Sequence, residues 1–259
     1  MRPTGTPVTR RARLTLFALA GPGLAAVLVI GLRGLPAFGD YHAVYGLVVT
    51  GVALSMRHAT DLVTAVNFDL RAFDTLGEEY ILFASVLGVT LLLRVMREED
   101  EEYSVARHDM YGSSDAVRML ALLLVPLMVA LGIYLVIHGQ LTPGGGFQGG
   151  IVLAAAPAAI MLAGRYVEVK ALAPTWAVEA TEAIGAAGYA LLGLGGLVFA
   201  SVYLRNFLPA GNAGQLLSAG FMPLNSIAVG LEVMGAFLVA WTAFLDQALL
   251  IRRRRRGNQ

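Results

Sequence analysis

One acidic residue is notable for the kind of segment that surrounds it. Glu232 lies within the apolar stretch 225–250, and on the sequence alone it is the only ionisable residue deep inside such a stretch. Ionisable groups inside a membrane are costly, and by default they indicate a function in moving ions or protons. The simpler alternative is a buried hydrogen bond to a neighbouring helix or subunit. Glu232 is therefore a candidate for an ion path.

A second group of carboxylates lies at the start of the apolar stretch 76–95. Asp69, Asp74 and Glu78 would attract cations if they gather at the outer membrane surface, and we treat them as ion-path candidates. The simpler interpretation is structural. Asp74, Thr75 and Glu78 would cap the helix, because Thr75 and Glu78 have the capping-box spacing. Asp69 and Arg71 would then form a local ion pair.

A glycine-rich segment, 138–150, begins with a histidine. His138 could relay protons because its pKa lies near neutrality, although a hydrogen bond to backbone or water is the simpler interpretation. Pro143 should stop the preceding helix, and the glycines predict a non-helical turn. Such a turn lies at the membrane surface or inside protein, since lipid cannot satisfy its backbone. We expect a structural loop that allows close packing or lines a wet cavity, formed by Pro143, Gly144, Gly145, Gly146, Phe147, Gln148, Gly149 and Gly150.

Three glycines of this segment also match G-x-G-x-x-G, which is typical of dinucleotide-binding proteins. They are Gly144, Gly146 and Gly149. That interpretation requires a preceding strand, whereas an apolar membrane stretch precedes the segment here. The sequence also shows no nucleophile–base pair, no metal-ligand cluster and no Walker loop. We therefore expect no enzymatic activity of the chain alone, no cofactor and no metal.

The composition is that of a membrane protein. Hydrophobic residues make up 57% of the 259 residues and charged residues only 14%, whereas soluble domains are about a quarter charged. The chain has no cysteine, which excludes disulfides and thiolate metal sites. Arginines near the start and at 252–256 flank apolar stretches, so they indicate cytoplasmic membrane flanks rather than nucleic-acid binding.

The apolar stretches predict an all-α, polytopic helical bundle. A span needs about 20 apolar residues, and six stretches qualify: 14–32, 76–95, 117–138, 148–164, 183–204 and 225–250. Glu179 and Glu182 would be solvated caps at the inner end of the fifth. Residues 41–56 are either a seventh span or an interfacial helix. With six spans, 15 basic residues lie on the cytoplasmic side of the membrane and 4 on the external side. With seven spans, 7 basic residues lie on the cytoplasmic side and 12 on the external side. The positive-inside rule favours six spans, with both termini cytoplasmic and the glycine segment outside.

An acidic stretch divides the chain into three predicted parts. Residues 96–116 form a cytoplasmic linker whose run at 97–102 is mostly Glu and Asp. This linker separates a two-helix unit, 1–95, from a four-helix unit, 117–259. The acidic run is either a solvated face or a contact for a basic partner.

Two regions resemble components of Mrp-type multisubunit monovalent cation/proton antiporters. Residues 67–93 resemble the carboxy-terminal region of the large MrpA-type component and the related small E-type component of membrane-bound hydrogenases. Residues 117–250 resemble the MrpB-type component, through Thr-Pro-Gly-Gly-Gly-Phe-Gln-Gly-Gly at 142–150, Leu216–Asn225 and Gly230-Leu-Glu232. One position departs from the pattern of this family. Its members have a second histidine two residues after the first, in His-Gly-His. Here the residue is Gln140, which cannot titrate.

The resemblance implies an integral subunit of a complex that exchanges sodium for protons across the plasma membrane. Its partners would be other antiporter subunits, including large pump subunits similar to those of respiratory complex I. Two alternatives remain. The chain could be a purely structural subunit that joins larger modules, or it could belong to the membrane arm of a hydrogenase-like, ion-pumping redox complex.

Overall fold

The described part of the chain folds into α-helices. The computed structural model describes residues 10–35, 39, 44–93, 113–163 and 166–257, and these contain no strand. The chain divides into two compact units, Met1–Val44 and Tyr45–Gln259. The predicted all-helical membrane bundle is confirmed. Most of the predicted linker, 96–116, lies outside the described residues, so the predicted three-part division stays a prediction.

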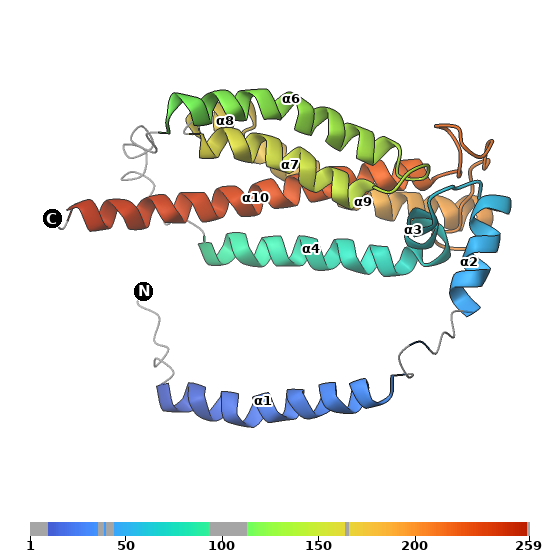
Figure 1. The fold of residues 1–259 in the computed structure, drawn as a ribbon, viewed down its shortest axis with the longest axis horizontal. Coiled ribbons are helices and arrows are strands. Elements are labelled where there is room, and N and C mark those ends of the chain that lie inside the picture. The colour runs from blue at the N-terminus through green and yellow to red at the C-terminus, as the bar shows by residue number, and fades with distance from the viewer. Residues whose placement is uncertain (1–9, 36–38, 40–43, 94–112, 164–165, 258–259) are drawn as a thin grey trace. The chain divides into compact units, whose positions relative to one another are not determined.

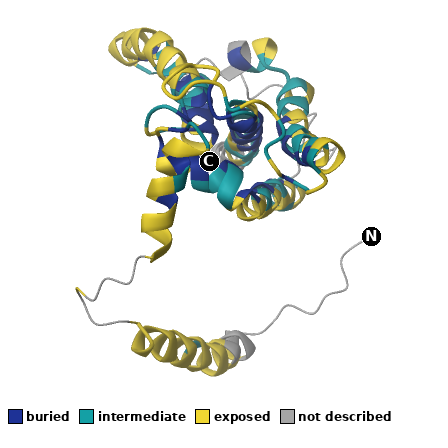
Figure 2. Cartoon of the chain, turned by 90° about the vertical axis from the view of Figure 1, so that its right-hand side faces the viewer, coloured by how far each residue is buried: buried dark blue, intermediate teal, exposed yellow. Residues whose placement is uncertain are grey.

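Helix α10 is the central element of the larger unit. α10 (Met222–Gly257) packs against α9 (Thr175–Ala200), α7 (Gly146–Leu162) and α4 (Ala72–Leu93), while α6 (Asp115–Ile137) packs mainly on α7 (Figure 1). Half of the apolar window of α10 is buried, against 11–22% in the other three long helices. Figure 2 shows buried residues on the inner helix faces and exposed residues on the outer ones. A polar residue on the inner face of α10 is therefore surrounded by protein.

Four helices are long and apolar enough to cross a membrane: α4, α6, α9 and residues Met222–Gln247 of α10. They correspond to the predicted stretches 76–95, 117–138, 183–204 and 225–250, although α9 begins eight residues earlier than expected. The other two predicted spans correspond to shorter apolar helices. These are Phe17–Arg33, within α1 (Arg10–Arg33), and α7, whose 17 residues reach about 26 Å. Six spans and cytoplasmic termini stay predictions.

The described part of the predicted stretch 41–56 forms one helix, which is too short to be a seventh span. α2 (Val44–Ser55) has 12 residues and is about 18 Å long, whereas the hydrocarbon core of a bilayer is about 30 Å thick. In Figure 1, α2 lies across the ends of the helices that pack against α10. Val49 and Ala53 are buried, so one face packs on the larger unit. Of the two alternatives for this stretch, the interfacial helix fits the structure better.

Short helices connect α2 to α4 at the same end of the larger unit. α3 (Leu62–Ala65) is capped by Asp61, whose side chain accepts a hydrogen bond from the main-chain nitrogen of Thr64. A π-helical turn, η1 (Val66–Leu70), follows. Such turns are rare and occur often at functional sites. Further along the chain, another short helix, α8 (Tyr166–Leu172), joins α7 to α9.

Candidate functional site

Three glutamates, not one, are buried inside the larger unit. Glu232 of α10 is fully buried, as expected, but Glu79 of α4 and Glu182 of α9 are only 3% and 5% exposed. The sequence predicted Glu232 as the only deep ionisable residue and Glu182 as a solvated cap, and both predictions are wrong. Glu179 is exposed, so one of the two expected caps does face outward.

The three carboxyl groups belong to one cluster. Glu79 and Glu232 lie close enough to interact electrostatically, and so do Glu182 and Glu232. The side chains of Glu79 and Glu232 form a hydrogen bond with each other, whereas one oxygen of Glu182 is buried without a hydrogen-bond partner. In the described part of the chain no basic side chain forms an ion pair with any of the three. Three membrane helices thus bring three carboxyl groups together without a basic partner.

Glycines allow α9 and α10 to approach closely enough to form this cluster. A Cβ atom placed on Gly185 of α9 would lie 2.3 Å from the main-chain nitrogen of Glu232. A Cβ placed on Gly235 of α10 would lie 2.6 Å from the main-chain nitrogen of Glu182. Small residues at such crossings are typical of membrane helix packing. Each glycine of one helix therefore faces a glutamate of the other.

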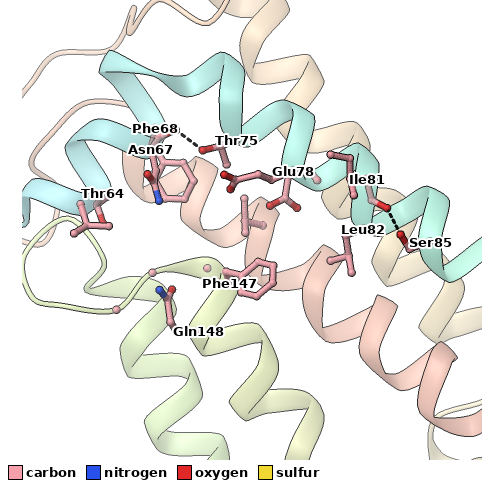
Figure 3. Close-up of a pocket in the computed structure, with 16 residues that line it drawn as sticks. Thr64, Asn67, Phe68, Thr75, Glu78, Ile81, Leu82, Ser85, Phe147 and Gln148 are labelled. Atoms are coloured by element: carbon pink, nitrogen blue, oxygen red, sulfur yellow. Dashed lines mark hydrogen bonds between the residues drawn. The ribbon is translucent and has the colours of Figure 1, made fainter. Parts of the chain in front are cut away.

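A cavity of about 530 Å³ opens beside the cluster (Figure 3). Glu79 lines it from α4, and Val229, one helical turn before Glu232, lines it from α10. Figure 3 shows Thr75 and Glu78 on α4 facing Phe147 and Gln148 at the start of α7. The cavity therefore connects Glu79 to the first turn of α7 and to the glycine segment.

The glycine segment is half loop and half helix. α6 ends at Ile137 with His138 as its C-cap. This end lies six residues before Pro143, so Pro143 does not stop the helix as predicted, and α7 already begins at Gly146. The expected non-helical turn therefore ends at Gly145 rather than Gly150. Gly145 has a φ of +110°, a conformation that glycine adopts readily.

The glycines inside α7 serve close packing, which was one of the two expectations for them. A Cβ on Gly146 would lie 2.2 Å from the carbonyl oxygen of Ser226 in α10. A Cβ on Gly149 would lie 2.8 Å from the carbonyl oxygen of Gly132 in α6. Glycine thus lets α7 fit between α6 and α10. Gly144, Gly145 and Gly146 also line the cavity, as the second expectation proposed.

The loop between α6 and α7 is fixed by hydrogen bonds from distant parts of the chain. The Thr64 hydroxyl donates to the carbonyl of Gly139 over 2.6 Å, and the Ser226 hydroxyl donates to that of Val136 over 2.6 Å. The side-chain amide of Gln140 donates to the carbonyl of Leu216 over 2.7 Å. Gln140 is fully buried, so the residue that replaces the family's second histidine anchors the loop.

The acidic group before α4 is organised differently from the expectation. Asp69 pairs with Arg57 over 2.5 Å rather than with Arg71, which pairs with Asp74. Burial raises the pKa of the Asp69 carboxyl above its usual range, and the Arg57 guanidinium offsets this only in part. Of Asp69, Asp74 and Glu78, only Glu78 lines the cavity.

The predicted capping box is also wrong. α4 begins at Ala72, so Thr75 lies inside the helix, and its hydroxyl donates to the carbonyl of Asn67 over 2.8 Å. This bond ties the π-helical turn η1 to α4. Because Thr75 and Asn67 both line the cavity, it also fixes one wall.

His138 lies apart from the carboxylate cluster. Its ring stacks on Tyr134 with 4.3 Å between centroids, and its Nδ1 lies 3.2 Å from the carbonyl oxygen of Tyr134. It is not among the residues that line the cavity. The structure therefore does not join His138 to Glu232, and its role in an ion path stays a prediction.

Comparison with known proteins points to one family. Residues 116–239 match the family model described as a domain related to the MnhB subunit of Na⁺/H⁺ antiporters. The chain belongs to this MnhB-related family. It is 35% identical over 220 residues to an uncharacterized protein of Methanocaldococcus jannaschii, an alignment that covers 76% of this chain and 80% of that protein.

Two solved structures contain chains similar to this MnhB-related protein. One is a chain of the membrane-bound sulfane sulfur reductase, an archaeal respiratory membrane complex. It is 30% identical with a TM-score of 0.65, and the match covers 92% of this chain and 98% of that one. The other is a chain of the Mrp complex from Dietzia sp. DQ12-45-1b, with 23% identity and a TM-score of 0.62. That match covers 91% of this chain but 26% of the other, and it shows a shared fold.

These similarities confirm the expected class of protein. The MnhB-related chain is a multi-pass membrane protein and a subunit of a cation/proton antiporter or of a related multisubunit complex. The predicted resemblance to the MrpB-type antiporter component is confirmed. The predicted fusion with an MrpA-like region at 67–93 stays a prediction.

Proposed function

We propose that this subunit carries protons within its complex, through the cluster of Glu79, Glu232 and Glu182. The observation that supports this most directly is the burial of three neighbouring carboxyl groups, two of them hydrogen-bonded to each other and none with a basic partner among the described residues. A carboxylate in an apolar interior is costly unless it is protonated or paired. Three such groups side by side can pass a proton from one to the next.

The arrangement gives this relay one wet end. Glu79 lines the cavity, whereas Glu232 and Glu182 are not among its lining residues and lie at the crossing of α9 and α10. A proton would enter through the cavity to Glu79 and pass to Glu232 and Glu182. The larger pump subunits would supply the rest of the path, so the chain alone would not transport. We also propose that it catalyses no chemical reaction by itself and that it lies in the plasma membrane.

The family description favours an antiporter over a redox complex, with sodium as the exchanged cation. The similar chain of the sulfane sulfur reductase keeps a respiratory complex as the second candidate. A purely structural subunit is less well supported, because a buried structural carboxylate normally has a basic partner. Here none of the three glutamates has one among the described residues.

Replacement of the cluster residues tests the proposal. Glu232→Gln and Glu79→Gln keep the size of the side chain but remove its ability to carry a proton. In membrane vesicles that hold the assembled complex, we expect most of the sodium-driven proton movement to be lost, measured with a pH-sensitive dye. Glu179→Gln, an exposed glutamate of the same helix as Glu182, is the matched control and should retain activity. Full activity of Glu232→Gln in a correctly assembled complex would show that the relay does not exist.

A further inference from the structure

A second cavity of the larger unit is almost entirely apolar. It has a volume of about 400 Å³ and is lined by α7 and α9, which both pack on α10 far more than on each other. Met234, Gly235 and Leu238 line it from α10. Thr181 is the one polar side chain among the described lining residues, and its hydroxyl already donates to the carbonyl of Ala177 over 2.8 Å. The cavity therefore suits an apolar ligand.

This second cavity begins at one membrane surface and reaches the centre of the bilayer. Its lining includes Leu172, just before α9, and Met234, in the middle of the membrane-crossing part of α10, Met222–Gln247. Leu172 is 87% exposed and the nearby Trp176 is 72% exposed, and exposed tryptophans are typical of the membrane–water interface. The part of α9 that lines the cavity ends at Thr181, about 9 Å from the start of the helix. Half of the hydrocarbon core is about 15 Å thick.

We propose that this cavity binds one acyl chain of a membrane phospholipid. Three helices that are long and apolar enough to cross a membrane, α6, α9 and α10, contribute to its wall. A helix of a neighbouring subunit fits less well, because a helix about 10 Å wide fills about 400 Å³ within a single turn. A slender chain can instead follow the cavity from the surface to the bilayer centre. In the predicted orientation, this lipid belongs to the cytoplasmic leaflet.

The bound chain would complete the packing beside the crossing of α9 and α10. Gly235 lines the cavity and also faces Glu182, because a Cβ placed on Gly235 would lie 2.6 Å from the main-chain nitrogen of Glu182. Thr181, the residue before Glu182, lines the cavity from α9. An acyl chain here would keep water away from this side of the crossing. The inference goes beyond the proton relay and does not depend on it.

Photolabelling of the purified, assembled complex tests the site. The complex is placed in nanodiscs of phosphatidylethanolamine and phosphatidylglycerol, and part of the phosphatidylglycerol carries a diazirine at the end of one acyl chain. After illumination, mass spectrometry identifies the labelled residues. We expect label on Met234 or Leu238, although Leu238 is only 7% exposed. Met222, which is fully buried and does not line the cavity, should stay unlabelled. A diazirine beside the glycerol should label neither Met234 nor Leu238, because it stays at the membrane surface.

Filling the cavity with protein should displace the chain. Ala177→Phe places a ring inside it, and Ala173→Phe does so nearer the membrane surface. We expect each to reduce the label on Met234 and Leu238 to the level of Met222. Ala183→Phe is the matched control, because Ala183 is exposed on the same helix but does not line the cavity. Its labelling should equal that of the parent complex.

Two results would overturn the lipid site. One is a parent complex in which Met234 and Leu238 stay unlabelled, as they would if a neighbouring subunit filled the cavity. The other is unchanged label on both residues in Ala177→Phe or Ala173→Phe. If neither variant assembles, the two diazirine positions in the parent complex still decide. Glu232→Gln should be labelled like the parent, because Glu232 does not line this cavity, so failure of the proton relay would leave the lipid site intact.

Discussion

A carboxyl group that loses its water needs a proton, a cation or a hydrogen-bond donor. In this subunit, neighbouring parts of the chain meet that need in different ways. Asp69 is paired with Arg57, and Asp74 with Arg71. Glu79, Glu182 and Glu232 have no basic partner among the described residues. This difference between paired and unpaired carboxylates is why we assign a proton path to the glutamates and a structural function to Asp69.

Asp69 should make the stability of the complex depend on pH. Its pKa is raised in the folded state by burial, so the folded chain binds this proton more tightly than the unfolded chain does. The stability that this group contributes is therefore complete below its usual value of 3.8 and falls as the pH rises through the raised value. We expect the thermal midpoint of the parent complex to fall over this range relative to that of Asp69→Asn. Parallel pH profiles of the two would contradict the assignment.

Glycine contacts set how closely the helices of the larger unit approach one another. α7 fits between α6 and α10 at Gly149 and Gly146, and α9 crosses α10 at Gly185. In a membrane, where lipid is as apolar as leucine, close backbone approach supplies the packing energy. The same crossings place the carboxyl groups, so helix packing and the proton path depend on the same residues.

Two glycines of α9 allow a matched test of this dependence. A Cβ on Gly185 would collide with the backbone of Glu232, whereas a Cβ on Gly188 would meet only the Cβ of Ala228, at 3.5 Å. Gly185→Ala should destabilise the complex by about 1–3 kcal/mol through overpacking, and it should also reduce exchange by separating Glu182 from Glu232. Gly188→Ala should be close to neutral in thermal unfolding and in exchange. Equal effects of the two substitutions would mean that the crossing at Gly185 has no special importance.

The larger unit consists of a central helix, α10, packed against helices whose outer faces are apolar and exposed. Leu92 of α4 and Phe199 of α9 are examples, at 86% and 75% exposure. Such faces suit lipid or neighbouring subunits, as expected for one subunit of a multisubunit membrane complex. The distribution of basic residues also predicts the orientation of the subunit in the membrane, with the loop between α6 and α7 on the external side.

Cysteine labelling tests this orientation directly, because the chain has no cysteine of its own. Pro143 is exposed on the loop, so Pro143→Cys provides one accessible thiol there. A membrane-impermeant maleimide added to intact cells should label it, whereas Asn258→Cys, beside the basic carboxy-terminal run, should react only after the cells are opened. The reverse pattern would invert the predicted topology.

The sequence by itself determined the properties that depend on local composition. The lengths of apolar stretches predicted α4, α6, α9 and α10, and the glycine motif at 142–150 predicted the family. The burial of Glu232 also followed, because no position within so long an apolar stretch lies near water.

Only the tertiary structure decided which residues meet. In a soluble helix, the polar face shows which side is inside, but in a membrane helix the lipid-facing and protein-facing sides are both apolar. The sequence therefore could not show that Glu79 and Glu182 face Glu232 across helix crossings. Nor could it show that Asp69 reaches Arg57, since that pairing depends on how the turn after α2 lies against η1. Rotation and packing of whole helices fixed these contacts, and neither can be read from local composition.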